Sequence, residues 1–169
     1  MSGMLPDAVD MLSPAEKEVY IELLAHLANS DGALVREEMA ALEAFMGRVL
    51  LKPDVREETR KRLRNTGNIE ELLEKATPNT LKIALRDSVL LAAADGEYHP
   101  AEVIVLERIA DVAGIGINGL DQLYDWVTEG WHWLAKGRTI VEMSIAGDEL
   151  LVEEENAPLH VRGDITEYE

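Results

Sequence analysis

One segment of the chain occurs twice, 64 positions apart, and each copy joins two helical patterns through an Asp-Gly turn. The first copy covers residues 29–38 and the second covers residues 93–102. The register continues beyond the turns in the aligned pairs Leu27 and Leu91, Ala28 and Ala92, Leu42 and Leu106, and Glu43 and Glu107. This duplication predicts two similar helix–turn–helix units within one fold.

Helix-start signals recur up to about residue 136. Ser13-Pro14-Ala15-Glu16 combines a capping residue, a proline at the first helical position and a glutamate that completes a capping box. Further starts are indicated at Asp54, Asn68, Thr77-Pro78 and His99-Pro100. With apolar residues at helical spacing, these signals predict helices at about 14–30, 36–50, 54–64, 69–76, 79–94, 100–113 and 119–136.

The predicted fold class is therefore all-α, a compact bundle of about seven helices built on the two repeated units. We assign residues 1–136 to this helical domain and residues 137–169 to an acidic C-terminal extension. Within the extension, Thr139 to Ile145 fits either a short helix or a strand, and Gly147-Asp148 predicts a turn. The stretch from Glu142 to Glu169 holds nine acidic residues, so we expect a solvated tail.

Composition excludes several classes of function. The chain has no cysteine, which rules out disulfides, thiolate metal sites and thiol catalysis. Its net charge of −17 argues against nonspecific binding to nucleic acid, which requires neutralisation of phosphates by Lys and Arg. No apolar run approaches the length of a membrane span, and no signal segment is evident, so we expect a cytoplasmic protein.

The two Asp-Gly turns bring carboxylates to equivalent places. Asp31 and Asp95 end one helix, and Glu38 and Glu102 follow seven residues later in the first turn of the next. A hard divalent cation such as calcium takes about six to eight oxygen ligands. If the two loops meet, these four residues supply most of a metal site, and Glu37 is an alternative to Glu38.

A metal-free interpretation of the same turns stays open. Asp-Gly is a common turn, and a glutamate in the first turn of a helix is favoured by capping and by the helix dipole. An EF-hand is excluded because Ala33, Leu34 and Val35 fill positions where that loop needs polar ligands. Asp87, in an apolar helix beside Arg86, is interpreted as a salt-bridge partner in preference to a metal ligand.

Three other patterns suggest functions that we do not assign. The segment 114–119 matches a dinucleotide-binding fingerprint but follows a helix, so we interpret it as a helix-ending loop with Asn118 capping the next helix. The cluster of Tyr124 and three tryptophans, with His132 among them, is interpreted as core in preference to a partner surface. The basic stretch 56–64 contains interspersed glutamates and is interpreted as a solvated helix.

The chain resembles the tellurite resistance protein TerB family over about Ser13 to Ile115. The resemblance depends on Ser30-Asp31-Gly32, on Ala94-Asp95-Gly96 and on the glutamates that follow them. It implies a helical bundle whose acidic cluster binds a divalent cation, and it implies a scaffold or sensor without enzymatic activity. The first half-site departs from the family pattern at Val35 and Arg36.

We accordingly expect a non-enzymatic protein of a tellurite-resistance or stress-response system. Calcium is the expected cation, at Asp31, Glu38, Asp95 and Glu102. A protein partner in a stress-response assembly is expected, with membrane association only through such partners and no nucleic acid. The alternatives are a metal-independent interaction module and a carboxylate-bridged metal hydrolase, which would need an open coordination position near a pocket.

Overall fold

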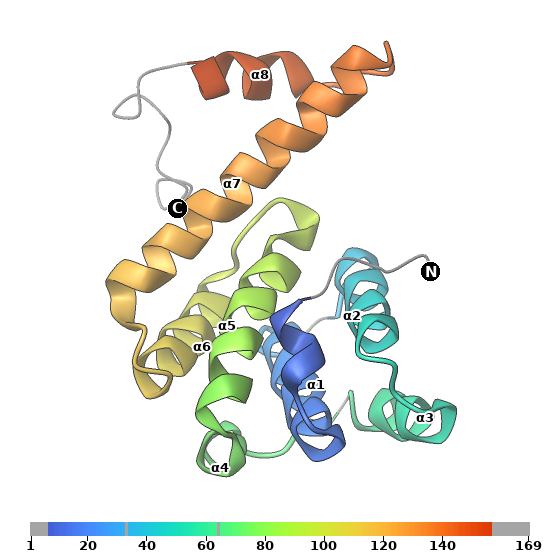
Figure 1. The fold of residues 1–169 in the computed structure, drawn as a ribbon, viewed down its shortest axis with the longest axis vertical. Coiled ribbons are helices and arrows are strands. Elements are labelled where there is room, and N and C mark those ends of the chain that lie inside the picture. Colours follow the sequence, from blue (N-terminus) through green and yellow to red (C-terminus); the bar gives the residue numbers. More distant parts are fainter. Residues whose placement is uncertain (1–6, 33, 64, 157–169) are drawn as a thin grey trace. The chain divides into compact units, whose positions relative to one another are not determined.

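The computed structural model describes residues 7–32, 34–63 and 65–156, and all regular secondary structure within them is helical (Figure 1). The elements are η1 (Ala8–Met11), α1 (Pro14–Ala28), α2 (Arg36–Arg48), α3 (Pro53–Arg62), α4 (Ile69–Lys75), α5 (Pro78–Ala92), η2 (Ala93–Asp95), α6 (Pro100–Val112), α7 (Gly116–Ile140) and α8 (Asp148–Asn156). The prediction of an all-α bundle is confirmed. None of the described helices is long and apolar enough to cross a membrane.

The predicted helix starts are present as side-chain caps. The backbone N–H of Glu16 donates to Ser13 Oγ (3.2 Å), and the N–H of Ser13 donates to Glu16 Oε2 (2.8 Å), which is the predicted capping box. The side chains of Asn68 and Thr77 cap α4 and α5 by accepting the N–H of Glu70 and of Thr80. The prediction at Asp54 was off by one residue, because α3 begins at Pro53.

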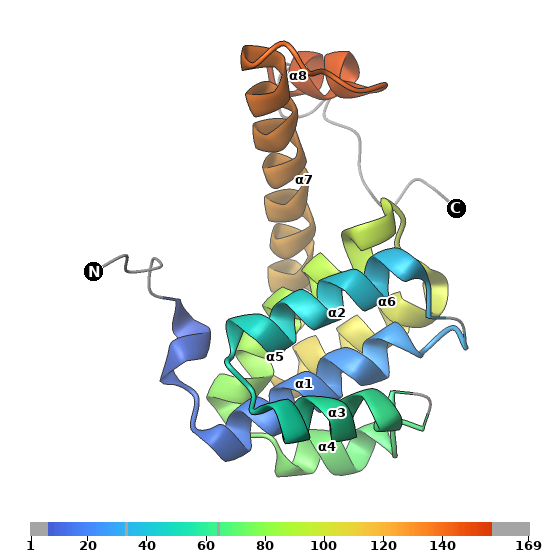
Figure 2. The same cartoon turned by 90° about the vertical axis from the view of Figure 1, so that its right-hand side faces the viewer.

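The first of two compact units ends at Leu120, and α1 lies at its centre. This helix packs against α5 on one side and α2 on the other, and it also contacts α4 and α6 (Figures 1 and 2). The residues buried in this core include the predicted apolar stripes, namely Val19, Leu23, Leu27, Leu81, Leu85, Val89, Leu106 and Ile109. Helical periodicity was therefore sufficient to identify the core of this unit.

A buried polar network fixes the start of the chain to α5. The Arg86 guanidinium donates to both carboxylate oxygens of Asp7 (2.7 and 2.6 Å) and to Asp87 Oδ1 (2.8 Å). The hydroxyl of Tyr20 donates to Asp87 Oδ2 (2.5 Å). The predicted salt bridge of Asp87 with Arg86 is confirmed.

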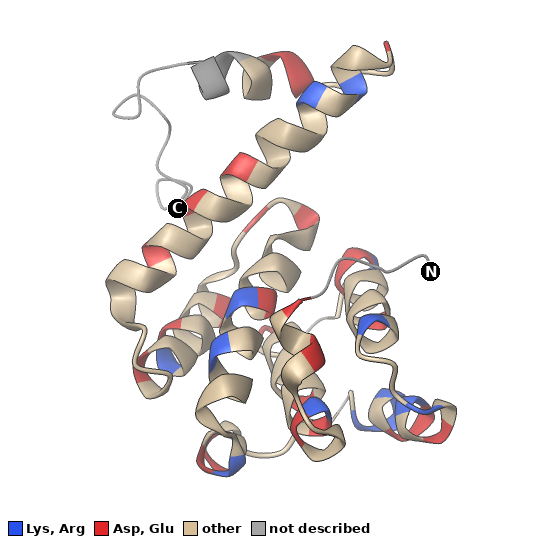
Figure 3. Cartoon of the chain, viewed as in Figure 1, with Lys and Arg blue, Asp and Glu red and all other residues tan. Residues whose placement is uncertain are grey.

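The basic stretch, predicted to be a solvated helix, also forms ion pairs with acidic residues of other helices. On α3, Arg60 pairs with Glu43, Arg62 pairs with Glu22, and Lys61 pairs with Glu57. Figure 3 shows basic and acidic residues side by side on this helix. The cations of α3 are therefore largely occupied by internal partners.

The second compact unit runs from Asp121 onward and differs most from the predictions. α7 begins at Gly116 and continues through Gly137 to Ile140, so Asn118 lies inside the helix and was wrongly interpreted as its cap. The turn at Gly147 is confirmed, with φ of +94°, and α8 follows it. The predicted domain boundary at residue 136 stays a prediction, and the end of the acidic tail (157–169) lies outside the described residues.

The interpretation of the tryptophan cluster as core was wrong in part. Tyr124 and His132 are buried, but Trp126 is 42% exposed and Trp133 is 72% exposed. The buried residues Leu120, Tyr124 and Val127 share a face of α7 that is different from the face of these two tryptophans. Aromatic content alone did not distinguish the two faces.

Candidate metal centre

Both Asp-Gly turns have the conformation that their glycines allow. Gly32 has φ of +80° and Gly96 has φ of +88°, a left-handed region in which residues with a side chain are strained. Each turn ends a helix of one repeat and redirects the chain toward the next helix, α2 in the first copy and α6 in the second. The glycines of the two turns therefore share the same left-handed backbone conformation.

The two glutamates that follow these turns are buried. Glu38 on α2 and Glu102 on α6 are each 2% exposed. Each carboxylate accepts a hydrogen bond at the start of its own helix, Glu38 Oε2 from the N–H of Val35 (3.2 Å) and Glu102 Oε2 from the N–H of His99 (3.0 Å). Both side chains are thus held in place by the backbone N–H of the residue that caps their own helix.

The fold brings these two carboxyl groups together. α2 packs against η2, which carries the second Asp-Gly turn, and α1 packs against α6. The side chains of Glu38 and Glu102 are hydrogen-bonded to each other. Two carboxylates cannot make such a bond without a proton, so the pair shares one.

Burial and mutual repulsion shift both acids toward their protonated forms. Burial, together with the hydrogen bond and the charge of Glu38, raises the pKa of Glu102 to about 8. Burial and the charges of Asp31 and Asp95 raise the pKa of Glu38, while its hydrogen bond from Glu102 opposes this rise. We therefore place the shared proton on Glu102, which donates to Glu38.

The two aspartates lie at the edge of this pair. Asp31 is half-buried and Asp95 is exposed, and the charges of both act on Glu38. Asp95 Oδ1 also accepts the N–H of Glu97 (3.0 Å), which closes the turn. Within the described residues, no three carboxylate or imidazole side chains are spaced to hold one metal ion. The structure thus joins the glutamates directly, while the charges of the two aspartates act on Glu38 from the loops.

The types of donor in this cluster, although not their spacing, are those of a site for a hard cation. In the described parts of the chain, no lysine, arginine or histidine forms an ion pair with Glu38 or Glu102. A buried carboxylate needs a compensating positive charge, which here comes only from the proton. All four donors are oxygens, as calcium and magnesium prefer. Nearby His99 uses Nδ1 to accept the N–H of Ala101 (3.3 Å) and acts as a helix cap.

The sequence missed one feature of this centre, which is the direct contact between Glu38 and Glu102. A signal for it was present in the sequence. Each glutamate is the N3 residue of its helix, three positions after the N-cap residue. In both repeats this position turns the carboxylate back toward the loop. The equivalence of the repeats then directs both carboxylates toward the same region.

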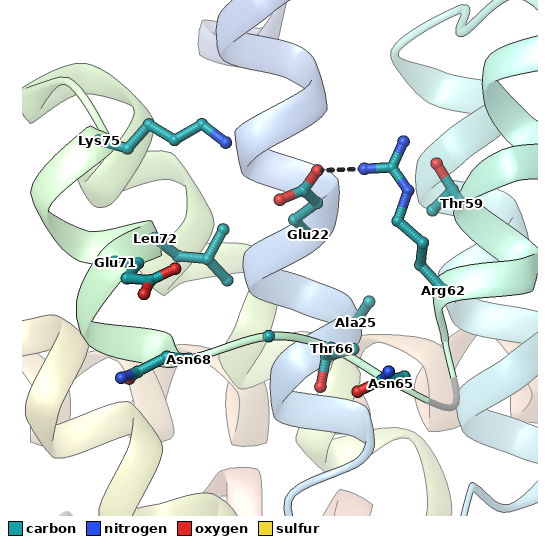
Figure 4. A pocket seen from close by; sticks show the side chains of 11 residues that line it. Glu22, Ala25, Thr59, Arg62, Asn65, Thr66, Asn68, Glu71, Leu72 and Lys75 are labelled. Atoms are coloured by element: carbon teal, nitrogen blue, oxygen red, sulfur yellow. Dashed lines mark hydrogen bonds and ion pairs between the residues drawn. The ribbon is translucent and has the colours of Figure 1, made fainter.

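A separate cavity of about 200 Å³ lies between α1, α3 and α4 (Figure 4). Glu22 and Arg62 form an ion pair at 2.9 Å on one wall, and Lys75 and Glu71 of α4 line the opposite wall. None of the four predicted metal ligands lines this cavity. The cavity therefore provides no open space beside the acidic pair.

Comparison with known proteins identifies the family of the chain. No curated protein and no solved structure gives a significant match to the chain. The family model described as tellurite resistance protein TerB matches residues 17–123, which include both repeats and all four carboxylates. This match covers more than half of the sequence, and the chain therefore belongs to the TerB family.

Proposed function

We propose that this protein binds one divalent cation, calcium, between the two repeats and acts as a scaffold or sensor in a stress-response system. Glu38 and Glu102 hold the ion, and Asp31 and Asp95 complete its ligands after a local adjustment of the two turns. The observation that supports this proposal is the buried contact between Glu38 and Glu102, which lacks a cationic partner among the described residues.

The same geometry suggests how binding would be sensed. Without a cation, a proton holds the two carboxyl groups together. A divalent ion replaces this proton and adds attraction for Asp31 and Asp95, which approach from the loops. Binding would therefore order the Asp-Gly turns and tie α2 to α6, without moving the helices of the core. We propose no catalytic step for this site.

A metal-independent interaction module is the second candidate. The observation that favours it is that the protonated pair is already satisfied, with a hydrogen bond between the glutamates and a backbone donor to each. In this alternative the acidic turns only connect helices, and another surface binds the partner.

A thermal-shift series separates the two candidates. The melting temperature is measured with calcium, magnesium, manganese and chelator for the native chain and for Glu38→Gln. A ligand that binds only the folded state raises the melting temperature as its concentration increases. We expect calcium to stabilise the native chain but not the variant.

Glu37, the alternative ligand suggested by the sequence, is exposed on α2 whereas Glu38 is buried, so Glu37→Gln serves as the matched control with the same change of charge. This control should keep the response to calcium. A native chain that is indifferent to all three metals would remove the metal-binding proposal and favour the interaction module.

A further inference from the structure

One face of α7 carries large apolar side chains separated by glycines. Trp126, Trp133 and Ile140 are spaced seven residues apart and are 42%, 72% and 73% exposed. Gly130 and Gly137 lie between them, also seven residues apart. At 3.6 residues per turn, these five positions form one stripe along the helix, which we call the Trp-Gly stripe.

The two glycines of the stripe have no packing role within the described chain. A Cβ atom added at Gly130 or Gly137 would meet no described atom within 4 Å. Glycine inside a helix costs about 1 kcal/mol relative to alanine, so two such residues oppose helix formation. They leave two open notches beside exposed tryptophans, a surface shaped to receive side chains from outside.

We propose that the Trp-Gly stripe docks against the same stripe of a second copy of this chain, with the two α7 helices antiparallel. In one register, Trp126 faces Gly137 of the partner subunit and Trp133 faces Gly130 of the partner subunit. A single register satisfies both contacts because the tryptophans and the glycines have the same spacing. Each large side chain then fills a notch, and the two-fold symmetry repeats every contact.

The charges along α7 favour this antiparallel arrangement. The acidic residues of α7 lie in its N-terminal half, and its basic residues lie toward its C-terminal end (Figure 3). Asp125, Glu129 and Lys136 share one flank of the stripe. In the proposed register, Lys136 lies between Asp125 of the partner subunit and Glu129 of the partner subunit. A parallel pair would instead oppose tryptophan to tryptophan, and it would place this charged flank of the two helices on opposite sides of the interface, where Lys136 meets neither acid.

The proposal is tested by the oligomeric state of the full chain, measured by light scattering and sedimentation equilibrium over a range of concentrations. We expect a dimer for the native chain. Gly137→Leu fills one notch and should raise the dimer dissociation constant at least tenfold. Leucine favours helix more than glycine does, so circular dichroism should show an intact helix. Met143→Ala, an exposed apolar residue outside the stripe, is the control and should leave the dimer unchanged.

A charge exchange tests the orientation. Lys136→Glu should weaken the dimer, and adding Glu129→Lys to the same chain should restore it, because each exchanged charge then meets its exchanged partner. A native chain that stays monomeric at its highest soluble concentration would overturn the proposal, whatever other protein the stripe binds. A dimer unaffected by both Gly137→Leu and Lys136→Glu would overturn it equally.

Discussion

Replacing Glu102 with glutamine removes a titrating group from the buried pair while keeping its hydrogen bonds. The amide NH₂ can donate to Glu38, as the protonated carboxyl does, and the amide oxygen can accept the N–H of His99. The variant therefore isolates the cost of burying an ionisable group at this position. We expect Glu102→Gln to be more stable than the native chain at neutral pH in the absence of metal.

The size of this gain follows from the pKa of Glu102, which is about 8 in the folded chain against an ordinary value of 4.5. A raised pKa favours folding only below the unfolded value, and the benefit is lost as the pH rises through the folded value. At pH 7 the unfolded chain has released a proton that the folded chain retains, which costs at most about 3 kcal/mol. Relaxation of the site reduces this cost, so we expect a gain of about 1–3 kcal/mol, or roughly 2–10 °C in melting temperature.

The assay is urea unfolding of both chains in chelator across the range from pH 4.5 to pH 8.5. The stability difference should be near zero at the acidic end, grow as the pH rises toward 8 and then level off. Glu37→Gln serves as the exposed control and should show no such rise. A Glu102→Gln variant whose advantage is independent of pH, or that is less stable throughout, would refute the account of a shared buried proton.

Three further predictions concern the stability of the first unit. Asp87→Asn leaves Arg86 without its buried anion and should cost about 3 kcal/mol in urea unfolding, whereas the exposed Asp111→Asn should cost little. Hydrogen bonds from Arg86 are the main cause that lowers the pKa of Asp7 to about 2. The Asp7 carboxylate should therefore stabilise the fold above pH 4 and lose this effect as the pH falls toward 2. In acid titrations of stability, Asp7→Asn should lack this part of the transition. Gly96→Ala, at φ of +88°, should lower stability by about 1 kcal/mol, while Gly67→Ala, which has no such φ, should not.

The helices of the first unit were predictable because their signals are local. Ser13, Asn68 and Thr77 cap helices through bonds to residues two or three positions away, so a short window of sequence contains the whole interaction. The network of Asp7, Arg86 and Tyr20 was not predictable as a whole. It joins residues 67 and 79 positions apart; the packing of α1 on α5 brings Tyr20 to Asp87, and the segment before η1 brings Asp7 to Arg86.

The second unit shows where local signals fail. Gly137 suggested the end of a helix, but α7 continues past it because no proline or competing turn follows directly. The tryptophans of α7 also follow helical spacing, which identifies faces without telling which face is buried. Trp126 and Trp133 belong to the exposed face, while Tyr124 and Val127 belong to the buried one.

The candidate site was predictable in its residue types but not in its geometry. Duplication pointed to Asp31, Glu38, Asp95 and Glu102 as an equivalent set. In the fold the two glutamates interact, and the charges of the two aspartates act on Glu38. The direct contact of the two glutamates depends on how α2 packs against η2, which is a tertiary property. For this reason the sequence could not show that the glutamates meet while the aspartates stay at the edge.

Isothermal titration of the metal-free chain with calcium tests the central claim most directly, because a site shared by two repeats has a defined stoichiometry. The account predicts one ion per chain, release of a proton on binding, and loss of binding in Glu38→Gln and in Glu102→Gln but not in Glu37→Gln. Two independent ions per chain, or no binding at all, would contradict it.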